Sequence, residues 1–246
     1  MDTVFTIEFL SEEWIRNASI TGFFMILYFY IASITKEENI TKFLKISALI
    51  VIVMTLTNHF LMITNGSWTL KKDLPFHLCS ISALVCCVIF FVKKKQFLFE
   101  FLFYAGITGG LLSISTPQIT LYNENYFFYI MFYFKHAAII SIPIVLMFRV
   151  KMNLSKYSGF KIFLTLNLLL AIIMPLNALI GSNYFYVATP PEVNNPLIIL
   201  GEGKILGLPD YVFYWEIILI IIIVLFYSIF KKRNRFCLRG RILKNT

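Results

Sequence analysis

The side chains best suited to covalent chemistry gather around a short polar stretch, "KKDLPFHLCS" (Lys71–Ser80), which leads directly into an apolar run. A cysteine thiolate is a nucleophile and a histidine can take up its proton, so a Cys–His pair is the minimum for nucleophilic acyl transfer. Cys79 is the candidate nucleophile. His77 is a poor partner for it, because side chains two positions apart diverge on a helix. The base must come from another segment, and His59 and His136 are available.

The position of Cys79 follows from where its helix is expected to begin. Pro75 fits the first position of a helix, with Asp73 or Leu74 as the cap, so Cys79 is predicted in the second turn. A helix N-terminus stabilises a thiolate, although this effect fades by the second turn. The lysines and Asp73 then belong to a loop that precedes a membrane helix.

The four cysteines indicate neither a disulfide framework nor a metal site. Cys79, Cys86 and Cys87 lie in one apolar segment and Cys237 lies in a basic tail, so no zinc-ligand spacing occurs. Cys86 and Cys87 are expected to be small packing residues. We therefore expect no metal and no cofactor.

The composition is that of a membrane protein. The 246 residues are 59% hydrophobic and 17% aromatic but only 14% charged, too few polar groups to cover a soluble domain. An all-α, polytopic helical bundle is predicted, forming a single transmembrane domain over residues 1–246 without internal repeats. The expected spans are about 18–34, 44–63, 74–92, 97–115, 126–148, 160–180 and 212–230. An acidic stretch before the first span argues against a cleavable signal peptide.

The net charge of +9 is interpreted as a topology signal. Of the 22 Lys and Arg residues, 17 fall in the loops after the first, third and fifth spans and in the tail 231–246. By the positive-inside rule, the N-terminus is outside and the tail is cytoplasmic, which suits a multi-pass protein of the cell membrane. The basic tail is expected to touch anionic lipid headgroups, and nucleic acid is not an expected partner.

With this topology, the polar side chains inside the spans gather in the outer half of the bilayer. Ionisable groups are costly in hydrocarbon, so each is a functional candidate. Alternative roles remain: Lys135 can snorkel outward or pair with Glu216, and Asn177 can satisfy backbone groups freed by Pro175. The outer loop 181–211 is either a connector or a cap over a site. The polar residues concerned are Asn58, His59, His77, Cys79, Thr108, Ser113, Ser115, Lys135, His136, Asn177, Asn183 and Glu216.

Four segments carry a resemblance to a known family. They are "LPFHLCS" (Leu74–Ser80), "FEFLFYAGITGGLLSISTPQI" (Phe99–Ile119), "FYFKHAAIISIPIVLM" (Phe132–Met147) and "NALIGSNYFYV" (Asn177–Val187). In order and spacing, these segments resemble the YwaF-like integral membrane family, which includes the animal transmembrane protein 164 type. The first, second and seventh spans match only in hydrophobicity.

The resemblance implies an activity and two catalytic residues. Animal members are described as acyltransferases that remodel ether phospholipids through a cysteine acyl intermediate with a partner histidine. On the matching segments, the cysteine is Cys79 and the histidine is His136. Two positions depart from the family pattern: Lys135 stands where a small uncharged residue is expected, and Phe76 replaces a smaller aliphatic residue.

Three functions are compatible with the sequence. The first is a cysteine-dependent acyltransferase in the outer leaflet, with phospholipids as donor and acceptor. For this enzyme, the expected substrate-binding residues are His77, His59, Lys135, Asn177, Asn183 and Glu216. The candidate oxyanion donors are Asn177, Asn183 or Ser80. The second is a transporter, channel or lipid-binding protein in which Lys135, His136 and Glu216 relay protons. The third is a structural or chaperone-like partner protein. The acyl chain, the acceptor and the oligomeric state stay open.

Overall fold

The computed structural model describes residues 2–122, 124–193, 203–205 and 208–242. Within these residues, six helices are long and apolar enough to cross a membrane, which confirms an all-α, multi-pass membrane protein. A shorter apolar helix, α3, lies among them. The helices are α1 (Glu12–Ile34), α2 (Glu37–Thr64), α3 (Leu78–Val88), α4 (Gln96–Phe101) continued by the π-helix η1 (Leu102–Gly106) and by α5 (Ile107–Ser115), α6 (Tyr126–Phe148), α7 (Ser158–Ile180) and α8 (Asp210–Ile242).

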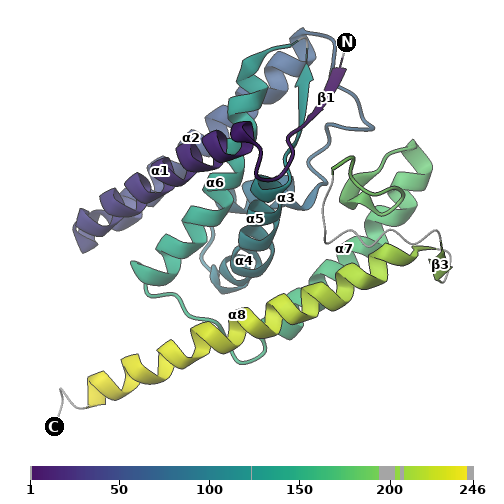
Figure 1. Cartoon of the computed structure of the whole chain (residues 1–246). Helices are drawn as coiled ribbons and strands as arrows, with labels where there is room; N and C mark the ends of the chain where they lie inside the picture. Colours follow the sequence, from purple (N-terminus) through teal and green to yellow (C-terminus); the bar gives the residue numbers. More distant parts are fainter. Residues whose placement is uncertain (1, 123, 194–202, 206–207, 243–246) are drawn as a thin grey trace.

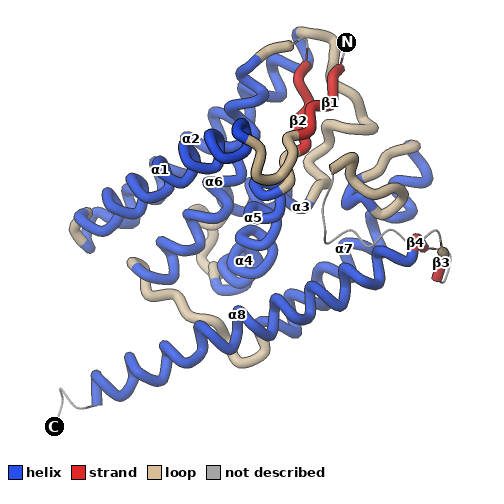
Figure 2. The backbone as a smooth tube through the Cα atoms, viewed as in Figure 1, coloured by secondary structure: helices blue, strands red, loops and turns tan. Residues whose placement is uncertain are grey.

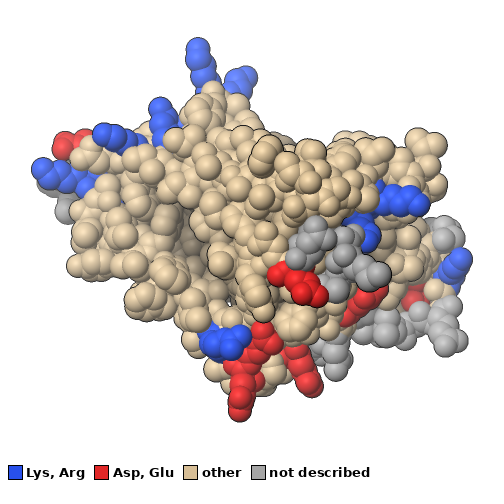
Figure 3. Space-filling view, turned by 90° about the horizontal axis from the view of Figure 1, so that it is seen from above, with Lys and Arg blue, Asp and Glu red and all other residues tan. Residues whose placement is uncertain are grey.

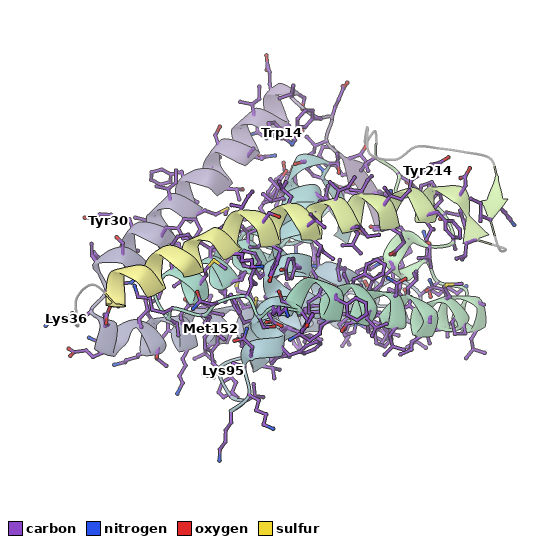
Figure 4. The ribbon with its side chains drawn as sticks, turned by 90° about the horizontal axis from the view of Figure 1, so that it is seen from below. Trp14, Tyr30, Lys36, Lys95, Met152 and Tyr214 are labelled. Atoms are coloured by element: carbon purple, nitrogen blue, oxygen red, sulfur yellow. The ribbon has the colours of Figure 1, made fainter. Side chains whose placement is uncertain are left out.

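Local sequence signals set several helix ends. The Ser11 hydroxyl caps α1 by accepting a hydrogen bond from the Trp14 amide, and two glutamates occupy the first turn, where they favour the helix dipole. Helix α7 stops at Gly181, whose φ of 66° is left-handed and suits glycine. Figure 4 shows Trp14 near the start of α1, Tyr30 near its end and Lys36 in the turn that follows.

The helices form two groups. In Figure 1, α1, α2 and α6 lie together, α3 and α5 pack against α6, and α7 lies beside α8. The π-helix η1 contacts α3, α6, α7 and α8, so it joins the two groups. Many large apolar side chains of α1, α2, α7 and α8 are exposed, as lipid-facing helices require, and Figure 3 shows a surface made largely of uncharged residues.

The third predicted span is only partly helical. The sequence predicts a full span over residues 74–92, whereas α3 has 11 residues and is roughly 16 Å long, about half of the hydrocarbon thickness. The predicted cap at Asp73 or Leu74 is wrong: His77 is the N-cap, so Cys79 lies in the first turn of α3. The reason is that the Asp73 carboxylate accepts a hydrogen bond from the Thr69 amide (2.7 Å) and closes a turn before Pro75.

One end of the bundle carries most of the ordered non-helical structure. Strand β1 (Asp2–Thr6) pairs antiparallel with β2 (Gln118–Tyr122), as the two red strands in Figure 2 show. We call this the ribbon end. It also holds segments 65–77 and 181–193, because the Tyr184 hydroxyl bonds to Leu70 and Leu74, and the Glu192 amide bonds to Gln118. A second short pair joins β3 (Lys204–Ile205) to β4 (Leu208–Pro209).

The opposite end is joined by different contacts. Arg149 after α6 donates to the Thr35 carbonyl after α1, and the Gln96 side chain of α4 donates to the Asn153 carbonyl before α7. The helices therefore alternate in direction, as the sequence predicts. Which end faces the cytoplasm stays a prediction. The side chains of residues 232–242 and all of residues 243–246 are outside the described part, which therefore covers little of the predicted basic tail 231–246.

A buried carboxylate anchors this opposite end. Glu100 is fully buried and accepts hydrogen bonds from the Gln96 amide (2.8 Å), the Ser155 backbone N–H (2.9 Å) and the Lys161 ammonium (2.8 Å). These bonds tie α4 to α7 and to the loop before α7. Because no water reaches Glu100, its charge depends on Lys161 and on the two neutral donors.

Lys161→Met is expected to lower the melting temperature of the purified protein clearly. Removing one partner of a buried pair leaves an uncompensated charge, which typically costs about 3–5 kcal/mol; the partial exposure of Lys161 places the loss toward the lower end. Lys45→Met, at an exposed position on α2, is the matched control and should change the melting temperature little. Equal melting temperatures of the two variants would contradict this role of Glu100.

Candidate functional site

A cavity of about 820 Å³ lies at the ribbon end between the two helix groups. Side chains of α2, α3, α5, α6, α7 and α8 line it, and segments 71–77 and 183–193 complete its wall. The cavity brings together most of the site residues predicted from the sequence. Those that line it are Asn58, His59, His77, Cys79, Ser80, Thr108, Ser113, Lys135, His136, Asn183 and Glu216.

Cys79 occupies the second position of α3, close to the free amide groups of the helix N-terminus. Its Sγ atom lies 3.4 Å from the Ser113 hydroxyl of α5, within hydrogen-bond distance for sulfur. Gly109, one turn before Ser113, makes room for the thiol: a Cβ atom at Gly109 would lie 3.2 Å from Sγ. The side chain of Cys79 is therefore positioned by α5 rather than by its neighbour His77.

His136 is held in a defined tautomer. Its ring is 4% exposed, and Nδ1 lies 2.6 Å from the Phe132 carbonyl, to which it donates because a carbonyl oxygen can only accept. The neutral ring then carries its lone pair on Nε2, the state a general base requires. Among the described residues, no hydrogen bond joins His136 to Cys79. Whether the two act as a pair stays a prediction.

The other two histidines have different surroundings. The His77 ring lies between Tyr184, in an edge-to-face contact, and Tyr186, in a tilted contact, with both ring centroids 5.1 Å away. His59 accepts a hydrogen bond at Nδ1 from the Trp68 indole (3.3 Å), so its neutral ring carries a proton on Nε2. His77 thus forms part of an aromatic wall, whereas His59 accepts from Trp68 and carries an Nε2–H group that can donate to a ligand.

Tyr186 completes the aromatic wall as a neutral phenol. Burial, with smaller contributions from the negative charges of Cys79 and Glu192, raises the pKa of Tyr186 to about 12. Its carbonyl accepts a hydrogen bond from the Tyr211 hydroxyl of α8 (2.6 Å), which ties segment 183–193 to that helix. This segment lies in the loop that the sequence predicts as a connector or a cap, and it forms part of the cavity wall.

Two predicted polar residues of the cavity lining have structural partners. Glu216 accepts a hydrogen bond from Asn167 of α7 (3.0 Å), and the ion pair with Lys135 that the sequence allows is not formed. Asn183 accepts from the Ala188 and Thr189 amides and so shapes its own loop.

Asn177 is not part of the cavity lining. It is 5% exposed, and its side-chain oxygen accepts hydrogen bonds from the Tyr184 amide and the Ser182 hydroxyl, while its amide group donates to the Tyr184 carbonyl. These bonds close the end of α7, and they go to Ser182 and Tyr184 rather than to the backbone groups freed by Pro175, which is the alternative that the sequence offers. Asn177 therefore positions Tyr184 and has no free group for a ligand.

The sequence assigns no role to Ser113, Gly109 or Tyr184 in positioning the thiol or its helix, although all three shape the site. The signal for the first two is their spacing: residues four apart on a helix share one face, so a glycine and a serine can frame the same neighbour. Tyr184 gives no comparable local signal. In the described part of the chain, no group of three or more His, Cys, Asp and Glu side chains is arranged to bind a metal.

Gly109→Ala is expected to displace the Cys79 side chain and slow its alkylation by a maleimide several-fold. The new methyl group would press on Sγ at a separation tighter than ordinary packing. Gly22→Ala in α1 is the matched control, because a Cβ there meets nothing within 4 Å. Peptide mass spectrometry separates Cys79 from the other cysteines. Unchanged alkylation of Cys79 in Gly109→Ala would show that α5 does not position the thiol.

The family comparison covers most of the chain. The model of the TMEM164 family matches residues 9–230, which include every described helix up to the middle of α8 and all the residues of the cavity except Val4. The YwaF-like part of the expected relationship is not tested by this match. No curated protein and no solved structure matches the chain. The chain belongs to the TMEM164 family of membrane proteins.

Proposed function

We propose that this protein is a membrane-embedded, cysteine-dependent acyltransferase that moves a fatty acyl group from a phospholipid to a lysophospholipid or another lipid acceptor. The observation that carries the proposal is the placement of Cys79 and His136 on one large cavity, with the thiol at a helix N-terminus and the imidazole held with Nε2 as its acceptor. The resemblance to cysteine acyltransferases supports the same two residues.

In the first half-reaction, His136 Nε2 accepts the thiol proton of Cys79, and the sulfur attacks the ester carbonyl of the donor phospholipid. A carbon–sulfur bond forms and the ester carbon–oxygen bond breaks. His136 returns the proton to the departing glycerol oxygen, so a lysophospholipid leaves and an acyl thioester remains on Cys79. The thiol must turn away from Ser113 for a direct bond to His136, or the bound substrate must draw the pair together.

In the second half-reaction, the hydroxyl of an acceptor lipid attacks the thioester while His136 takes its proton. The carbon–sulfur bond breaks, a new ester forms, and the proton restores the Cys79 thiol. Both half-reactions balance with the two lipids and these two side chains alone.

The negative charge on the tetrahedral intermediate needs donors close to Cys79. The backbone N–H groups of Cys79 and Ser80 lie in the first turn of α3, where helical amides have no intrahelical partner. The Ser113 hydroxyl is a third donor beside Sγ. We prefer these groups to Asn177 and Asn183 as oxyanion donors. The side chains of both asparagines already form hydrogen bonds with nearby residues of the loop after α7.

Acyl transfer from an isotopically labelled phospholipid to a lysophospholipid in proteoliposomes tests the proposal. Cys79→Ala and His136→Ala are expected to reduce the rate by at least about a thousandfold, since each removes a group that acts directly on the reacting atoms. Wild-type protein should carry a hydroxylamine-sensitive acyl group on Cys79, detectable by mass spectrometry. Cys87→Ala, a buried change in the same helix away from the cavity lining, is the control.

Two results would contradict the proposal. One is full acyl transfer by Cys79→Ala without any thioester in the wild type. The other is movement of lipid or protons across the bilayer that survives Cys79→Ser but stops in His136→Ala. The latter result would favour the non-enzymatic transporter that the sequence also allows.

A further inference from the structure

Lys135 lies inside a membrane-spanning helix, and no carboxylate of the described residues pairs with it. It lies nine residues after the start of α6, roughly 14 Å along the helix, and its half-buried side chain lines the cavity. In the described segments, Lys135 forms no hydrogen bond and no ion pair. An isolated ammonium group is costly at this depth, and such residues usually face a pathway or a ligand.

Three carboxylates line the cavity, and in the described residues none of them forms an ion pair with Lys135; Glu192, on segment 183–193, is one of them. Asp73 accepts from the Thr69 amide, and Glu216 accepts from Asn167. Lys135 instead interacts electrostatically with Cys79 and with all three histidines, which places its charge at the centre of the site. The described part of the cavity wall therefore presents a cation without an ion-pair partner, close to the proposed nucleophile.

His59 supplies a second donor on the same cavity. Because the Trp68 indole donates to Nδ1, the neutral ring of His59 keeps its proton on Nε2. His59 lies within electrostatic range of Lys135. A cation and a neutral N–H donor that line one cavity are suited to an oxyanion with several acceptor oxygens, such as a phosphate group, for which lysine acts as a point charge.

We propose that Lys135, assisted by His59, binds the phosphate group of the lipid substrate. The glycerol backbone places the phosphate only a few bonds from the ester carbonyl. A phosphate held by Lys135 would therefore position the acyl ester beside Cys79, and it would supply the counter-charge that Lys135 lacks. The identity of the lipid rests on the proposed function, whereas the binding of a phosphate group does not.

Ligand binding to the Cys79→Ala protein tests this inference without requiring catalysis. The probes are lysophosphatidylglycerol, a monoacylglycerol with the same chain, and inorganic phosphate, titrated against purified protein in detergent. The lysophospholipid is expected to bind about tenfold or more tightly than the monoacylglycerol, because a charge-assisted hydrogen bond in a poorly hydrated site is worth that much. Adding Lys135→Met should reduce this ratio to near one, and adding Lys135→Arg should retain most of it. Adding Lys45→Met is the charge-matched control and should leave the ratio unchanged.

Three outcomes would overturn the inference. An unchanged ratio in the Lys135→Met variant would show that Lys135 does not recognise phosphate. Slower alkylation of Cys79 in a Lys135→Met protein that retains Cys79, together with that unchanged ratio, would assign Lys135 to the thiol instead. If inorganic phosphate stabilised the protein through Lys135 as strongly as the lysophospholipid does, the ligand would be free phosphate and the lipid assignment would fall. A lack of acyl transfer in wild-type protein would contradict the proposed function alone.

Discussion

The hydroxyl group of Tyr184 holds together the part of the structure on which the site depends. It donates to the Leu70 carbonyl (2.7 Å) and accepts from the Leu74 amide (2.9 Å), while the Tyr184 backbone is fixed by Asn177. Backbone without regular hydrogen bonds is tolerated at membrane depth only where protein or a cavity surrounds it. Segment 65–77 is such a backbone, and the Tyr184 contacts determine where it ends and α3 begins. The position of Cys79 therefore depends on a side chain more than 100 residues away.

Close packing of small residues on the other side of Cys79 completes its surroundings. A Cβ atom at Gly110 would lie 2.5 Å from Ile140, and one at Gly106 would lie 3.1 Å from the Ile139 carbonyl, so both glycines let the η1–α5 segment lie directly against α6. Gly109 faces Cys79 instead. Gly106 and Gly110 thus allow α6, which carries His136, to pack on one face of the η1–α5 segment. Gly109 leaves room for Cys79 of α3 on another face of that segment. This is the physical reason that the two residues share a cavity.

The long apolar runs are sufficient to predict the six long helices and their alternating direction, because hydrocarbon leaves the backbone few alternatives. Rules that use only neighbouring residues mispredict a helix start where the backbone bonds to a residue far along the chain. Pro75 has the right type for a helix start, yet the bond from Leu74 to Tyr184 keeps that residue in the loop. The pairing of β1 with β2 is also beyond local rules, since two short strands separated by more than 100 residues leave no periodic pattern. Cys79, the three histidines and Lys135 can be recognised as candidates by their chemistry, but the partners Ser113, Phe132 and Trp68 depend on the fold.

Some polar side chains around the cavity form hydrogen bonds within the protein, and others do not. Asn177 and Asn183 form hydrogen bonds with the loop that follows α7, and Glu216 of α8 accepts a hydrogen bond from α7. A protein that needed only a stable bundle would have no reason to keep further polar atoms in a cavity of this size, where each one costs free energy. Several polar groups on the cavity nevertheless form no bond that joins helices in the described part of the chain, and Nε2 of His136 and the ammonium of Lys135 are two of them, while the thiol of Cys79 contacts only the Ser113 hydroxyl. The proposed nucleophile, base and cation together suit an ester that carries a negative charge, and a phospholipid is the ester that a membrane supplies in abundance.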